Sequence, residues 1–489
     1  MLRRLLTILF LLDPGAASLL AGEPPNTDKI VTTATSDLHV DPTKGDDAND
    51  GRTQAVKTIK RAVSLAQPGD TIHLATALYH ESANLHGMKG EPNKPITLDG
   101  HGAVLDGSEP VHAADWEALG HGLFRKAHLM PHMENPSTQG AVIMRWFFLW
   151  DGKMNHMGRT SKGPSAPLKK PADLQPGEWT YVKEEDAFYL RIPPGQELDA
   201  AKIRAPIRDA GVAESGGTQH VIVRNLITSH VYNDGYNIHG SERDCVFENI
   251  AAIECGDDGF SAHEDAECRI DGYVSIGNST GLCDTVSSIT HYRNLFIKDC
   301  LGYDVFFIGD SPHSIENGLV ISSAHNAVSL GRHVDRTQKG PAAILFRNVR
   351  VQRVGGPQEV RVTRDAKLTA RQCTFSGLNV QLSVGGEMNA EKCLFNGEPK
   401  PEIILAQNTL WLSEENVYDI AGVKMDKTTF TEKTFKDFQH LSGGDKTSHW
   451  GASGPEIKEA GADEVTMKKL EATAEDIVQR WRALEASQP

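Results

Sequence analysis

Aromatic residues and long apolar segments are scarce in this sequence. Aromatic side chains account for only 7% of the 489 residues. No stretch of about 20 consecutive apolar residues occurs, which is the length that a membrane-spanning helix requires. The sequence therefore predicts no contact with a membrane once its N-terminal leader, described below, has been removed.

Basic residues are also too few to dominate the surface. The 50 Lys and Arg are outnumbered by 65 Asp and Glu, which gives a formal net charge of -15. No basic stripe is present that could neutralise phosphates, so nucleic acid and anionic membranes are not expected partners. The same balance disfavours a strongly polyanionic substrate unless the binding cleft is locally basic.

Cysteine is limited to seven residues between positions 245 and 393, and their spacing does not match a zinc module. Cys245 and Cys268 occupy equivalent positions of the repeat described below, as do Cys373 and Cys393. Stacked coils would bring such pairs within the Cα separation of a disulfide. A column of buried thiols fits the pattern equally well.

The first 22 residues have the pattern of a cleavable signal peptide. Basic Arg3 and Arg4 precede the short apolar run Leu5–Leu12, and small residues follow up to Gly22. We therefore expect a secreted or periplasmic protein.

A repeat of 22 to 24 residues dominates the middle of the chain. The intervals between successive repeat starts are 24, 23, 22, 23 and 31 residues, at Asn225, Asn249, Gly272, Asn294, Asn317 and Asn348. Each period holds short β-branched runs between Gly and Asn turns, which is typical of one coil of a parallel β-helix. Residues one period apart then become neighbours about 4.8 Å apart. The Asn column predicts an internal hydrogen-bonded ladder at a sharp turn.

Alternation along each coil predicts which side chains face outward. With Asp234, Asp258 and Gly281 taken as equivalent, the outward positions include Asn237, His239, His263 and Asp284. The 31-residue interval predicts an insertion near Arg332–Lys339 at the rim of the same polar face.

After the leader, the segment Leu38–Gly51 is followed by the amphipathic segment Thr58–Ala66 and then by the first strands. This arrangement closely resembles the start of secreted right-handed parallel β-helix proteins of the pectate-lyase-like superfamily. This resemblance implies an all-β solenoid with an N-terminal capping helix. We expect a monomer, because closed backbone ladders between coils leave no long free edge. The expected divisions are a signal peptide at 1–22, cap and first coils at 36–115, an inserted β-rich subdomain at 116–206, the main β-helix at 215–400, and C-terminal coils, loop and helix at 401–489.

The expected insertion at 116–206 holds four of the seven Trp. These residues could pack its core or form a sugar platform.

Three carboxylates, Asp234, Asp257 and Asp258, are expected to meet on adjacent coils. The segments Asn233-Asp234-Gly235 and Asp257-Asp258 resemble motifs of the polygalacturonase family and have a spacing similar to that of β-helix α-galactosidases. The resemblance implies an inverting glycoside hydrolase, with Asp234 as general acid and the other two activating water across roughly 6.5–9.5 Å. The family's Gly-His-Gly is missing from the next coil. Asp-Gly at a turn also has a purely conformational explanation.

The outward residues Asn237, His239, His263 and Asp284, together with Arg332, are candidates for substrate binding. No metal ligand set is assigned, although the two histidines with Asp284 could ligate a metal. The hydrolase requires no cofactor, and the expected substrate is a polysaccharide or oligosaccharide. A polysaccharide lyase or epimerase, with Ca²⁺ on the Asp residues and a basic residue as the proton acceptor, is an alternative, as is a non-catalytic glycan-binding solenoid.

Overall fold

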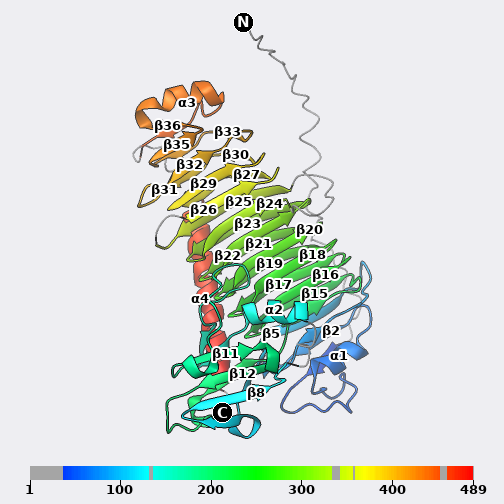
Figure 1. The fold of residues 1–489 in the computed structure, drawn as a ribbon. Helices are drawn as coiled ribbons and strands as arrows, with labels where there is room; N and C mark the ends of the chain where they lie inside the picture. The colour runs from blue at the N-terminus through cyan, green and yellow to red at the C-terminus, as the bar shows by residue number, and fades with distance from the viewer. Residues whose placement is uncertain (1–36, 131–135, 333–341, 356–357, 452–459, 488–489) are drawn as a thin grey trace.

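The computed structural model describes residues 37–130, 136–332, 342–355, 358–451 and 460–487. These residues form a parallel β-helix whose coils stack along one long axis, with the insertion against its N-terminal part (Figure 1). The expected all-β, parallel β-helical fold is therefore confirmed. The expected signal peptide at 1–22 lies outside the described residues.

Two ladders of parallel strands run along the solenoid. Ladder A contains the longer strands and includes β1 (Asp37–Val40), β2 (Thr71–Leu74), β3 (Leu78–Tyr79), β5 (Ile96–Asp106), β15 (Val221–Ser229), β17 (Cys245–Ile253), β19 (Glu267–Ile276), β21 (Ile289–Lys298), β23 (Pro312–Ser322), β25 (Ala343–Arg353), β27 (Lys367–Arg371), β28 (Thr374–Ser376), β30 (Glu387–Glu391), β31 (Leu394–Asn396), β33 (Leu410–Glu414), β34 (Val417–Tyr418) and β37 (His449–Trp450). Ladder B comprises β4 (Ala83–Asn84), β14 (Val212–Glu214), β16 (Tyr236–Gly240), β18 (Asp258–Glu264), β20 (Thr280–Val286), β22 (Tyr303–Gly309), β24 (Asn326–Gly331), β26 (Gln358–Thr363), β29 (Leu378–Ser383), β32 (Glu402–Leu405), β35 (Gly422–Met425) and the antiparallel β36 (Thr428–Phe430).

The repeated Asn bends the long strands of ladder A in the middle. Asn225, Asn249, Asn294, Asn317 and Asn348 all have φ between 50° and 59°, the left-handed conformation that Asn tolerates best among non-glycine residues. Their amides bond along the stack, and the Asn348 Nδ2 to Asn317 Oδ1 distance is 2.8 Å. The ladder therefore exists, but the expectation that it is internal is wrong. Asn249 is exposed, because the bend turns these side chains away from the core.

The apolar core fills the space between the two ladders, and helices cover its open surfaces. Helix α1 (Ile59–Leu65) buries Ile59 and Ala62 at the N-terminal end, as expected for a cap. Helix α3 (Phe435–Ser442) packs at the opposite end (Figure 1). Helix α4 (Glu464–Ala486) lies along the side of ladder A and packs Met467, Leu470 and Trp481 against its outer face. The long C-terminal helix thus stabilises many coils at once.

The segment between β5 and β14 leaves the repeat and forms two antiparallel four-stranded sheets. Its elements are β6 (Ser108–Pro110), β7 (Glu117–Gly120), β8 (Leu123–Ala127), α2 (Pro136–Arg145), β9 (Phe148–Trp150), β10 (Lys153–Asn155), β11 (Glu178–Val182), β12 (Ala187–Arg191) and β13 (Ile203–Pro206). Trp116, Trp146 and Trp179 are buried in a separate core. Trp146 also stacks on Tyr232 of the solenoid. These three aromatics pack the insertion, so they do not form a sugar platform.

All seven cysteines are buried, free thiols. Cys245 pairs with Cys268 in the β17–β19 register, as the repeat predicts. Their side chains fill the coil interior, where burial raises the pKa of the Cys268 thiol well above its usual value.

Candidate active site

The three predicted carboxylates meet where the chain passes from ladder A into ladder B. Asp234 precedes β16, Asp257 precedes β18, and Asp258 is the first residue of β18. One oxygen of each lies within 4.8 Å of the others. Strict alternation would have turned Asp257 away from its neighbours, but the turn before each strand brings all three together. They are 2–7% exposed.

The backbone ladder fixes this turn from coil to coil. The Gly235 N–H donates to the Asp258 carbonyl at 2.9 Å, and the Asp258 N–H donates to Asp234 Oδ1 at 3.0 Å. A Cβ at Gly235 would lie 2.7 Å from the Ala252 Cβ, inside ordinary contact distance. The Gly after Asp234 is therefore required by close packing against the neighbouring strand.

Two cations of the insertion complete the site. Arg145, the last residue of α2, places Nη1 2.7 Å from Asp257 Oδ2. Lys162 places Nζ 2.9 Å from Asp257 Oδ1 and 2.6 Å from Asp258 Oδ1. The Ser161 hydroxyl also donates to Asp257. None of these residues was predicted, because they lie roughly a hundred positions earlier in an irregular segment that carries no repeat.

Burial and charge separate the protonation states of the three acids. Burial and the charges of Asp258 and Asp257 raise the pKa of Asp234 well above its usual range. Burial would also raise the pKa of Asp257, but Lys162 and Arg145 outweigh it and lower that pKa. Burial and the Asp257 charge raise the pKa of Asp258 to about 6. The cluster therefore sets an acid with a raised pKa beside a carboxylate with a lowered pKa, which is the arrangement that acid–base catalysis needs.

The positive charge beside the carboxylates is already provided by protein groups. The Lys162 ammonium bridges Asp257 and Asp258. Burial alone would lower the pKa of Lys162, but the two carboxylate charges outweigh this effect and raise that pKa well above the usual value. A Ca²⁺ ion needs six to eight oxygen ligands and would have to displace this ammonium. The side chains as they lie do not fit the Ca²⁺ that the lyase alternative requires.

A polar track leads from the carboxylates across ladder B. The Ser261 hydroxyl donates to Asp258 Oδ2 at 3.2 Å and lies 2.7 Å from His263 Nε2. His263 is stacked on His239 with ring centroids 4.5 Å apart. Asn237 lies beside Ser261 in the register, and its buried Oδ1 has no hydrogen-bond partner among the described residues. Asn237, His239 and His263 therefore do share one outward face next to the acids.

Asp284 does not belong to this face, and the expectation that it points outward is wrong. Asp258 aligns with Thr280, so Asp284 aligns with the inward Ala262. Its side chain is fully buried and accepts hydrogen bonds from Thr290 and Tyr292. The interval from Asp258 to its neighbour is one residue shorter than assumed, and a shift of one residue moves every side chain to the opposite face of a strand. Asp284 is thus neither a substrate nor a metal ligand on this surface.

Arg332 also lies apart from the carboxylates. It follows β24, four strands along ladder B from β16, or roughly 19 Å at the usual strand spacing. Its Nη1 lies 3.9 Å from Asp365 Oδ2. The neighbouring insertion at 333–341 lies outside the described residues. Arg332 can contact only a substrate that extends over several coils.

The spacing of the acids does not support the expected inverting geometry. Neighbouring coils are only about 4.8 Å apart, and the nearest carboxylate oxygens lie within 4.8 Å. Inverting glycosidases hold their carboxyl groups roughly 6.5–9.5 Å apart so that a water molecule fits between them. The ladder itself therefore sets a shorter separation.

No family model and no curated protein matches this sequence. Among solved structures, the chain is similar to XylC, described in complex with xylose, with a TM-score of 0.44, 11% identity, and 87% of this chain and 85% of that chain covered. A glycoside hydrolase gives a TM-score of 0.42 at 10% identity, with 89% and 100% covered. A rhamnogalacturonan lyase gives 0.33 at 11%, with 91% and 98% covered. At such identities these likenesses concern the chain path and assign no residue.

Proposed function

We propose that this protein is a carbohydrate-active enzyme, and specifically a glycoside hydrolase that acts through Asp234, Asp257 and Asp258. The observation that carries the proposal is the opposite perturbation of neighbouring acids, in which the pKa of Asp234 is raised and that of Asp257 is lowered. Perturbed acids of this kind gather at catalytic sites, because an acid and a base must coexist at one pH.

Asp234 acts as the proton donor to the leaving oxygen in this proposal. Asp258, whose pKa is about 6, is ionised at neutral pH and serves as the base or nucleophile. Asp257 is paired with Arg145 and Lys162 and stays ionised, and its negative charge raises the pKa values of Asp234 and Asp258.

The polar track provides the surface that would hold the sugar. Asn237 offers a carbonyl oxygen that has no hydrogen-bond partner in the described part of the chain. Burial lowers the pKa of His239, so its imidazole is neutral at pH 7. Such groups hydrogen-bond hydroxyls without adding charge. We propose a neutral or weakly charged oligosaccharide or polysaccharide as the substrate, and a secreted or periplasmic location for the enzyme.

The experiment is an activity screen of the purified protein on a glycan panel, measured by the release of reducing ends. Asp234→Asn, Asp257→Asn and Asp258→Asn should each lower turnover per folded molecule roughly 10²–10⁴-fold, because Asn keeps the shape of the side chain and loses the ionisable proton. The matched control is Asp271→Asn, an exposed aspartate of β19 that accepts a hydrogen bond from Asn294. Retained wild-type turnover in all three variants, with lowered melting temperatures, would show that the acids only fasten the insertion to the solenoid.

The lyase remains the second candidate, because the insertion brings basic residues that were not apparent near the acids in the sequence. Lys162 and Arg145 could neutralise a uronate, but Lys162 is held protonated by Asp257 and Asp258 and is a poor proton acceptor. Absorbance of unsaturated products, followed with and without EDTA, separates the two reactions. A lyase also releases one reducing end per cleavage, so one unsaturated product for each reducing end would replace the hydrolase with the lyase.

A further inference from the structure

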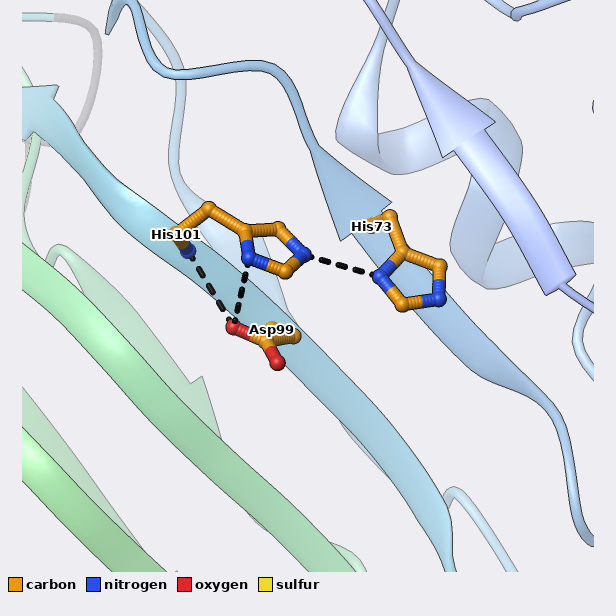
Figure 2. A group of neighbouring side chains, drawn as sticks. All are labelled: His73, Asp99 and His101. Atoms are coloured by element: carbon orange, nitrogen blue, oxygen red, sulfur yellow. Dashed lines mark hydrogen bonds and ion pairs between the residues drawn. The ribbon is translucent and has the colours of Figure 1, made fainter.

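A pair of histidines lies on the outer face of ladder A, away from the carboxylate site. His73 Nδ1 and His101 Nε2 face each other at 2.8 Å, and Figure 2 shows these nitrogens turned toward one another from β2 and β5. The two rings are nearly parallel, with centroids 5.1 Å apart. A third ring, His39, stacks on His73 from the next strand at 5.4 Å.

A bulge in β5 places His101 opposite His73. Arg224 pairs with Asp99 and Leu226 pairs with Ala103, so three residues of β5 stand where the next strand has only Asn225. On this coil the bulge of three residues therefore stands in the place that a single Asn occupies on the following coils. A Cβ at Gly100 would lie 2.6 Å from the Asn225 carbonyl oxygen, so only Gly fits there. The two extra residues carry His101 back over His73.

Each ring has a carboxylate at its other nitrogen. His73 Nε2 lies 3.2 Å from Asp37 Oδ1, and His101 Nδ1 lies 3.6 Å from Asp99 Oδ1. Asp99 is buried and held in place by Arg224 Nε at 2.7 Å and Asn225 Nδ2 at 3.0 Å. Carboxylates in these positions favour a proton on the outer nitrogen of each imidazole, as they do behind metal-binding histidines.

This proton arrangement leaves two lone pairs facing each other. Lone pairs 2.8 Å apart repel unless a positive charge lies between them. We propose that His73 Nδ1 and His101 Nε2 bind a divalent transition-metal ion, with Asp37 and Asp99 orienting the two rings from behind. Imidazole pairs suit Zn²⁺, Cu²⁺ and Ni²⁺, whereas Ca²⁺ and Mg²⁺ prefer oxygen ligands.

The site can open enough to admit the ion. Zn–N bonds of about 2.0–2.1 Å place two tetrahedral nitrogens about 3.3 Å apart, so the rings must separate by roughly 0.5 Å. The His101 side chain is 46% exposed and can make this movement. The exposed side leaves positions for water, and bridging β2 to β5 would fasten the first coils together.

The test measures Zn²⁺ binding to the untagged full-length protein by calorimetry and equilibrium dialysis, with excess Ca²⁺ and Mg²⁺ present. The wild-type protein should bind one equivalent and melt at a higher temperature with zinc. His73→Asn and His101→Asn should each weaken binding more than 100-fold, and Asn tolerates the positive φ of 48° at position 101. Asp37→Asn should weaken it roughly 10–100-fold, because it loosens the ring without removing a ligand.

The matched control is His291→Asn, an outward histidine of the same ladder that is hydrogen-bonded to Ser314 and should leave zinc binding unchanged. Three results would overturn the proposal: no uptake by the wild-type protein at micromolar zinc, uptake that survives both His73→Asn and His101→Asn, or an equal loss in the control. The first result would mean that the two rings share only a proton. The assay is independent of glycan cleavage, so it stands whether or not the carboxylate site is catalytic.

Discussion

The coils beside the insertion and the later coils of the solenoid both carry ion pairs, but these pairs differ in their exposure to solvent. Beside the insertion, Lys162, Asp257 and Asp258 are 3–23% exposed and form short ion pairs. On the later coils, Lys367 pairs with Glu387 and Arg371 with Glu391, and these four side chains are 35–51% exposed. The ladder geometry is the same in both regions.

The difference shows what an inserted subdomain adds to a regular solenoid. On the outer face of the later coils these charges lie in solvent, where an ion pair contributes between zero and about 1 kcal/mol. The insertion covers one turn of the coil and excludes water from it, so the same residue types acquire strongly perturbed pKa values. The predictions below test this contrast.

Lys162→Met should give the largest effect. It removes the cation shared by Asp257 and Asp258 and leaves two buried carboxylates with less compensation, at a cost of about 3–5 kcal/mol in the free energy of unfolding. Lys367→Met, the matched change on a later coil, should cost less than about 1 kcal/mol. Urea unfolding followed by circular dichroism measures both. Equal costs would show that the insertion does not shield the cluster.

His230 lies in a second cluster of buried charges and should make the free energy of unfolding depend on pH. Burial lowers the pKa of His230, but Asp106, Glu254 and Glu485 outweigh it and raise that pKa to about 10. A raised pKa gives stability that is complete below about pH 6.5 and is lost as pH rises through 10. We expect the free energy of unfolding to fall over this window, and His230→Gln should abolish the fall. His449→Gln, on exposed β37, should keep the wild-type slope; a slope that survives in His230→Gln would contradict the assignment.

The pH dependence of turnover should follow the acid cluster. Asp258 must be ionised, so activity should rise about tenfold per pH unit up to roughly pH 6 and level off above it. Because the pKa of Asp234 is also raised, an alkaline limb should appear where Asp234 loses its proton. Initial rates on the best glycan, corrected for the folded fraction, measure the profile. A flat acidic limb would remove Asp258 from the reaction, whereas the limb should persist in Lys367→Met.

Asn317→Ala should give the smallest effect, about 1 kcal/mol of destabilisation. The substitution forces Ala into φ of 59° and breaks the amide ladder to Asn294 and Asn348 at a half-buried position. Asn317→Gly, which removes the backbone strain but not the lost hydrogen bonds, should recover part of the loss. Thermal melting of the three proteins distinguishes the two contributions, and unchanged melting in Asn317→Ala would contradict both.

The sequence determined the features that recur regularly from one coil to the next. The 22- to 24-residue interval gave the coil, the Asn column gave the bend, and the paired motifs before β16 and β18 brought Asp234, Asp257 and Asp258 together. A C-terminal helix was also expected within 401–489 and is observed at Glu464–Ala486. These features are local, because each coil contacts its sequence neighbours one period away.

The tertiary structure alone decided the rest. Arg145 and Lys162 reach the acids from 112 and 96 residues away in the chain, and an irregular insertion carries no period from which their positions could be counted. Asp284 turned inward because a single missing residue reverses the alternation of a strand, which no average repeat length reveals. His101 met His73 only because two extra residues push it out of the coil. A regular repeat determines which residues are neighbours on successive coils. Insertions and bulges have no period, so their contacts depend on side-chain packing in the folded chain.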